Sequence, residues 1–136
     1  MEEIKMNVNT GLAKVIIADG DIEYGYFYFN PADFELSKRY DEVIERLNKI
    51  KLPQDATYED ILAVGEEIKR LFDYLLNYNV SDEIFKVANP FTPTQNGEFY
   101  FTNILEGVAK ICKSQTQKRL AAKEEKINKA LAKYKK

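Results

Sequence analysis

A long apolar stripe between Thr57 and Asn79 dictates how the rest of this chain must pack. In the segment TYEDILAVGEEIKRLFDYLLNYN, large apolar residues recur at the three- and four-residue steps of one helix face: Ile61, Val64, Ile68, Leu71, Phe72 and Leu75. Leu62 and Leu76 widen this face, and the other side is charged: Glu59, Glu66, Glu67, Lys69, Arg70 and Asp73. Because so wide an apolar face needs cover on more than one side, we expect this helix at the centre of the core.

Capping signals mark where the helices begin. Thr57 can accept a hydrogen bond from a free N–H group at a helix start, and Asp60 can return one, which predicts a helix over 57–79. Asn30 as N-cap and Pro31 in the first helical position predict a helix over 31–50. Ser81 predicts a short helix over 81–88. The pattern after Phe99 predicts a helix over 99–112, and its buried stripe would be Leu105, Val108, Ile111 and Cys112.

The residues before Asn30 carry strand patterns. Ile4, Met6 and Val8 alternate with polar residues, which predicts a short strand with one buried face. Residues 12–18 and 22–29 predict two more strands. Asp19-Gly20 between them is a two-residue type I′ hairpin signal, since both positions tolerate a positive φ.

The third predicted strand, IEYGYFYF, is aromatic on both faces. One face carries Ile22, Tyr24, Tyr26 and Tyr28, and the other carries Phe27 and Phe29. Either face can be the one that packs on the helices. Tyr24, Tyr26 and Tyr28 are candidate partner-binding residues, with the alternative that their hydroxyl groups simply reach solvent above apolar rings.

Together these segments predict an α+β fold that is mainly α: a short N-terminal antiparallel β-meander or hairpin, then a helical bundle with an extended basic C-terminal helix. Residues 1–112 would form the globular body, and residues 113–136 a helical extension. At 136 residues the chain is one domain by size.

The composition excludes several classes of site. The chain has no histidine, so it lacks Ser-His-Asp and Cys-His catalytic arrangements and Cys/His zinc sites. It has no glycine-rich phosphate loop, and no feature singles out a pair of its carboxylates. We therefore expect no enzyme, no cofactor and no metal.

Cys112, the single cysteine, is expected to be a small buried hydrophobe rather than a reactive thiol. No apolar run is long enough for a membrane span and no signal peptide is evident, so we expect an intracellular protein.

Charge is unevenly distributed along the chain. From Lys110 to Lys136 there are ten basic residues against Glu124 and Glu125, whereas the whole chain has a net charge of −2. The only large apolar residues after Lys113 form a narrow seam: Leu120, Ile127, Leu131 and Tyr134.

Three interpretations of this basic segment compete: a solvated helical extension, a helix that docks on another chain through the seam, and phosphate contact with nucleic acid. The last is the least favoured, because the segment has a single arginine and one aromatic residue. Membrane adsorption is weaker still.

Several motifs resemble the small tail assembly chaperones of long-tailed phages of Gram-positive hosts. The opening NVNTG…IEYGYFYFNPADFELSKRYDEVIERL is similar to a short β segment that leads into an FNP-D helix start, here Phe29, Asn30, Pro31 and Asp33. The segments FDYLLN and SDEIFKVANPF match a second pattern through Phe72, Asp73, Ile84 and Phe85. The basic end KINKALAKYKK is also similar. The chain departs from the family where a glycine usually precedes the short helix: it has Asn77, Tyr78, Asn79 and Val80.

This resemblance implies a non-enzymatic function in the cytoplasm of the bacterial host. The protein would bind the long, coiled-coil-rich tape-measure protein, keep it soluble and help load tail-tube subunits, with self-association as a further option. The alternatives are another small phage protein that acts by protein–protein binding, either structural or anti-defence, and a nucleic-acid binder that uses the basic tail.

Overall fold

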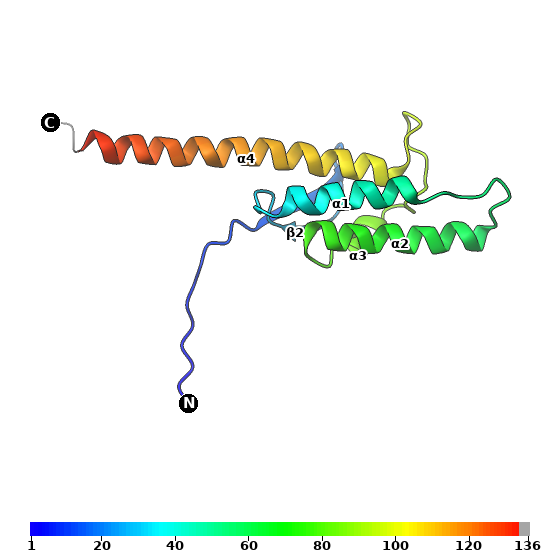
Figure 1. Ribbon diagram of the computed structural model, residues 1–136, viewed down its shortest axis with the longest axis horizontal. Coiled ribbons are helices and arrows are strands. Elements are labelled where there is room, and N and C mark those ends of the chain that lie inside the picture. Colours follow the sequence, from blue (N-terminus) through cyan, green and yellow to red (C-terminus); the bar gives the residue numbers. More distant parts are fainter. Residues whose placement is uncertain (134–136) are drawn as a thin grey trace.

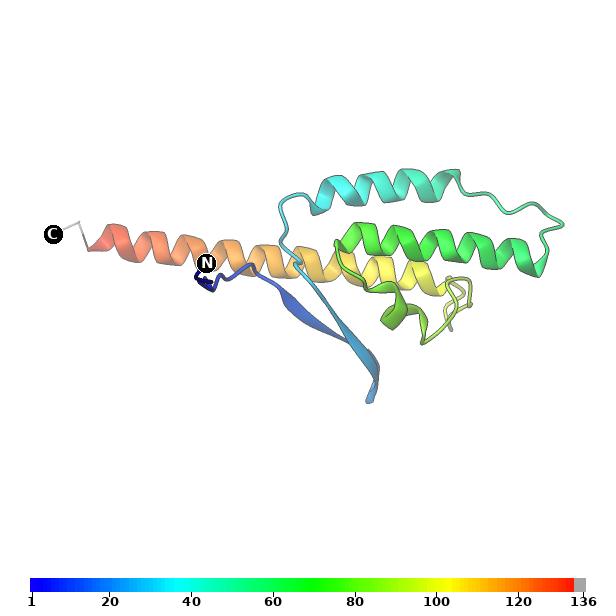
Figure 2. The same cartoon turned by 90° about the horizontal axis from the view of Figure 1, so that it is seen from below.

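The computed structural model describes residues 1–133. Two strands precede four helices along the chain: β1 (Ala13–Asp19), β2 (Ile22–Phe29), α1 (Leu36–Lys49), α2 (Tyr58–Leu76), α3 (Ser81–Phe85) and α4 (Tyr100–Ala132). α1 lies on one side of α2 and α4, the β-hairpin and α3 lie on the other, and α4 continues well beyond the remaining helices (Figures 1 and 2). The predicted class, mainly α with an N-terminal antiparallel hairpin and a long C-terminal helix, is confirmed.

The central helix α2 begins as predicted. The Asp60 backbone N–H donates to Thr57 Oγ1 over 3.1 Å, and the Thr57 N–H donates to Asp60 Oδ2 over 2.9 Å. The helix ends where Asn77 adopts a left-handed conformation with φ of 53°. Ile68, Leu71, Phe72, Leu75 and Leu76 are buried, so this predicted face is the core face.

The core joins all the elements around α2. Phe27 and Phe29 of β2 are buried, as are Leu36 and Val43 of α1, Ile84 and Phe85 of α3, and Leu105 and Val108 of α4. Phe85 contacts two other rings edge-on, that of Phe72 at 5.3 Å and that of Tyr100 at 5.9 Å between centroids. Phe85 of the short helix α3 therefore packs between an aromatic ring of α2 and one at the start of α4.

The predicted start of α1 is wrong by about five residues. Asn30 does not cap a helix; its Oδ1 accepts a hydrogen bond from the Ala32 N–H and closes a turn. Asp33 does the same for Glu35 over 3.1 Å, so two successive turns precede Leu36. The side chains of Asn and Asp compete with the helix for backbone N–H groups, and here local turns form instead.

The predicted strand over Ile4–Val8 is wrong. Residues 1–10 are exposed and have no strand partner anywhere in the part of the chain that the structure describes. The other two strands form, but the turn lies one residue later than predicted, because Asp19 pairs with Ile22. Gly20 has φ of +60° and Asp21 has no positive φ, which is the type II′ rather than the type I′ arrangement.

The last helix is continuous across the predicted boundary at residue 112. Arg119 still contacts the body, through a 3.1 Å hydrogen bond from its Nη1 to Asn30 Oδ1. Every described residue after Arg119 is exposed. The part of α4 that leaves the body thus begins about two turns later than the sequence predicts. None of the helices within residues 1–133 is long and apolar enough to cross a membrane.

Candidate functional site

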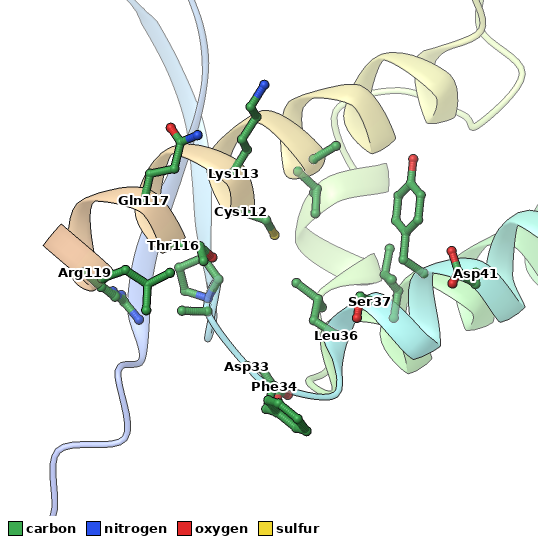
Figure 3. Close-up of a pocket in the computed structure, with 17 residues that line it drawn as sticks. Asp33, Phe34, Leu36, Ser37, Asp41, Cys112, Lys113, Thr116, Gln117 and Arg119 are labelled. Carbon is green, nitrogen blue, oxygen red and sulfur yellow. The ribbon is translucent and has the colours of Figure 1, made fainter. Parts of the chain in front are cut away.

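A groove of about 820 Å³ separates the start of α1 from the middle of α4 (Figure 3). Its walls are mainly apolar: Pro31, Leu36 and Tyr40 from one side, and Val108, Cys112 and Leu120 from α4. Charged residues also line the groove, Asp33 and Asp41 on the α1 side and Lys113 and Arg119 on α4. The groove can therefore take apolar side chains at its floor and polar groups at its edge.

One rim of the groove is held by a buried arginine. Arg39 Nε donates to the Leu75 carbonyl oxygen over 2.9 Å, and its Nη2 donates to Asp33 Oδ2 over 2.7 Å. The hydrogen bond from Arg39, together with the one from the Glu35 N–H, lowers the pKa of Asp33 below its usual value. This network fixes the turn that displays Phe34, whose side chain is 97% exposed.

The predicted seam continues the groove along α4. At ~100° per residue, Leu120, Ile127 and Leu131 fall within about 40° of one another on the helix surface. Ala109 and Lys113, which line the groove, lie in the same angular range, and Thr116, which also lines it, lies about 20° outside that range. All three seam residues are exposed, and Leu120 belongs to both surfaces. We call the groove and these three residues together the α4 track. Tyr134, the fourth predicted seam residue, lies outside the described residues.

The predicted aromatic surface forms only in part. Tyr26 and Tyr28 are exposed, their rings meet edge-on at 5.6 Å, and Lys14 Nζ lies 4.1 Å from the centroid of the Tyr26 ring. Ile17 pairs with Gly25 but Ala18 pairs with Glu23, so Tyr24 occupies a β-bulge. Tyr24 lines a different hollow, together with Val87, Tyr100 and Ile104. The bulge thus separates Tyr24 from the other two tyrosines.

The sequence interpretation missed the groove because its walls come from segments far apart in the chain. Val108 and Cys112 belong to the predicted buried stripe of the last helix, but a stripe on one helix does not tell which surface it meets or where a gap remains. Phe34 is the available signal, since it is a large aromatic residue next to the helix start. Within residues 1–133 there is no group of three or more His, Cys, Asp or Glu side chains that could hold a metal ion.

The reactivity of the Cys112 thiol measures how well the groove shields this side chain from solvent. Its side chain is half-buried and points into the space between α4 and the start of α1 (Figure 3). Burial raises the pKa of the thiol to about 11. Since the thiolate is the reactive form and an unfolded cysteine has a pKa of about 8.5, native Cys112 should react on the order of 100-fold more slowly near neutral pH.

This difference is measured by timed alkylation of native and urea-unfolded protein at the same pH. Below the pKa, the thiolate fraction and hence the native rate should rise roughly tenfold with each unit of pH. Equal rates for native and unfolded protein would show that the groove does not shield the thiol.

Comparison of the chain with protein-family models, with curated proteins and with solved structures finds no match.

Proposed function

We propose that this protein is a non-enzymatic phage tail assembly chaperone. It binds the tape-measure protein in the host cytoplasm, keeps it soluble and helps to assemble the tail tube around it. The observation that carries the proposal is the α4 track, an apolar groove that runs on into an exposed seam on a projecting helix. The resemblance of the FNPAD, FDYLLN and SDEIF segments to the chaperone family supports the same conclusion.

The α4 track suits a helical partner. From Leu120 to Leu131 the seam spans about 16 Å at 1.5 Å per residue, or three turns, so a partner helix can lie along it. Groove recognition places apolar anchors at i, i+3, i+4 and i+7 of such a helix. A coiled-coil-rich chain exposes apolar seams of this kind until the tube encloses it, and uncovered seams associate with one another. The many lysines beside the seam favour an acidic partner surface. Tyr26 and Tyr28 are available for a second contact, such as a tail-tube subunit.

The proposal is tested by co-expression with the tape-measure protein of the same genome, followed by affinity capture at moderate salt. We expect the long protein to become soluble and to co-purify. If it stays insoluble and nothing is captured, the chaperone function is wrong, and a structural or anti-defence protein becomes the better interpretation.

Two double variants locate the contact. Ile127→Gln with Leu131→Gln removes the apolar seam and should weaken capture at least ~10-fold, since each buried aliphatic side chain contributes about 1.5–3 kcal/mol. Ala122→Gln with Ala132→Gln changes the other faces of the same helix without altering its charge, and should capture normally. Because all four residues are exposed, neither variant should change the melting temperature of the body. Equal capture by both variants would exclude the seam.

A further inference from the structure

The N-terminal arm, residues 1–10, has a strand pattern but no strand partner among the residues that the structure describes. Ile4, Met6 and Val8 are 85%, 81% and 67% exposed, and they alternate with Lys5 and Asn7. Within residues 1–133, the first eight residues make no hydrogen bond to the rest of the chain. Figure 1 shows the arm projecting away from the body. An extended segment of this kind presents both free backbone groups and an unused apolar face.

A cluster of side chains at the base of the arm sets its direction. Asn30 Nδ2 donates to the Thr10 carbonyl oxygen over 2.6 Å, and Arg119 Nη1 donates to Asn30 Oδ1 over 3.1 Å. The Gly11 N–H donates to Asn9 Oδ1 over 3.1 Å, and Gly11 has φ of +83°. These contacts connect the base of the arm to the residue that follows β2 and to α4. The arm therefore leaves the body instead of folding back along its own β1.

The hairpin has an edge that fits such an arm. β1 pairs only with β2 among the described residues, so its other edge has no strand partner. β2 instead packs against α3. A hollow of about 240 Å³ lies between the hairpin and α4, and apolar residues of β1, β2 and α4 line it: Val15, Ile17, Phe27, Ile104, Val108 and Ile111. Gly107 also lines the hollow, and a Cβ atom there would meet no other atom within 4 Å.

We propose that the arm of one copy of this chain pairs with the free edge of β1 in a second copy. The alternating apolar residues Ile4, Met6 and Val8 enter the hollow beside Gly107, while Lys5 and Asn7 face solvent. A two-stranded sheet is marginal by itself, and the added strand makes it three-stranded. Strand addition of this kind uses backbone hydrogen bonds for affinity and alternate side chains for specificity.

The arm that occupies the free edge of β1 comes from a second copy of the same chain. The arm and the edge with its hollow belong to the same protein, so a two-fold exchange satisfies both arms and both edges and leaves none free. The inference does not depend on the proposed chaperone function, since it concerns self-association through the arm and β1 and not binding of the tape-measure protein; the hollow and the groove share only Val108 among their lining residues.

The experiment measures the mass of the full chain by light scattering and sedimentation over a range of protein concentrations. We expect a dimer that dissociates on dilution. Met6→Lys places a charge on the apolar face of the arm and should weaken the dimer at least ~10-fold. Asn7→Lys adds the same charge one residue along, on the solvent face, and should leave the dimer intact. The arm is exposed in the single chain, so neither variant should change the fold.

Hydrogen exchange provides the second measurement. In the dimer, the alternate amide groups of residues 4–8 that point toward β1 should be protected, and Met6→Lys should remove this protection. A wild-type protein that is monomeric throughout would overturn the proposal. So would a dimer equally sensitive or equally insensitive to the two substitutions. A monomer with protected arm amides would show that the arm pairs with its own hairpin, which also overturns it.

Discussion

Replacing Phe72 by alanine should lower the free energy of unfolding by about 3–5 kcal/mol, the cost of removing a fully enclosed aromatic side chain. The Phe72 side chain is completely buried in α2 and packs edge-on against Phe85 of α3. Phe85 in turn contacts Tyr100 at the start of α4. The cavity left by the substitution therefore lies where three helices meet, and none of them can close it without losing its other contacts.

Phe34→Ala is the matched control, because it deletes the same atoms at a position that is 97% exposed. It should change the free energy of unfolding by less than about 0.5 kcal/mol. Urea unfolding followed by circular dichroism compares both variants with the wild type. A loss under ~1 kcal/mol for Phe72→Ala would mean that this face of α2 is not the core, since buried Phe→Ala substitutions cost several times more.

Replacing Asp73 by alanine should lower the free energy of unfolding by about 2–4 kcal/mol, because it leaves several polar groups without a partner. Asp73 Oδ1 accepts hydrogen bonds from the N–H groups of Val80 and Ser81, each over 2.8 Å. Asp73 Oδ2 accepts a third from Ser81 Oγ over 2.7 Å. This carboxylate on α2 thus caps α3, and the cap holds Phe85 in the core.

Graded substitutions separate the cap from a general effect of charge. Asp73→Asn retains one oxygen for the two N–H groups and should lose about half as much stability as Asp73→Ala. Ser81→Ala removes one of the three hydrogen bonds and should cost little once Asp73 is already alanine. Chemical denaturation of the single and double variants measures this coupling. Fully additive effects of Asp73→Ala and Ser81→Ala would contradict the shared cap.

The elements that the sequence predicted correctly depend on local chemistry. The Thr57–Asp60 capping box is complete within four residues, and both hydrogen bonds form. The alternating pattern of residues 22–29 likewise forms the predicted strand, because its partner β1 lies just before it in the chain, across a short turn. By contrast, Asp73 was placed on the charged face of α2, because a pattern confined to one helix does not show that the next helix will start beside it.

The errors occur where local signals compete. Asn30-Pro31 is a sound helix start, yet the Asn30 side chain also bonds to Thr10 and Arg119, which are distant in sequence. Ile4–Val8 has the pattern of a strand, but a strand also needs an edge to pair with, and the contacts at Thr10 and Asn30 direct this segment away from the edge of its own hairpin. The bulge at Tyr24 likewise depends on how two strands pair, so one strand alone does not predict it.

The sequence by itself determined the helical class, the hairpin, the central position of α2 and the exposed seam at Leu120, Ile127 and Leu131. Periodicity and caps are sufficient for these features, because they describe one element at a time. Only the tertiary structure decided that Phe27 and Phe29 are the buried face of β2, that the seam extends into a groove, and that the N-terminal arm has no strand partner within residues 1–133. These features depend on which surfaces meet, and that is set by packing of the whole chain rather than by the pattern of any one segment.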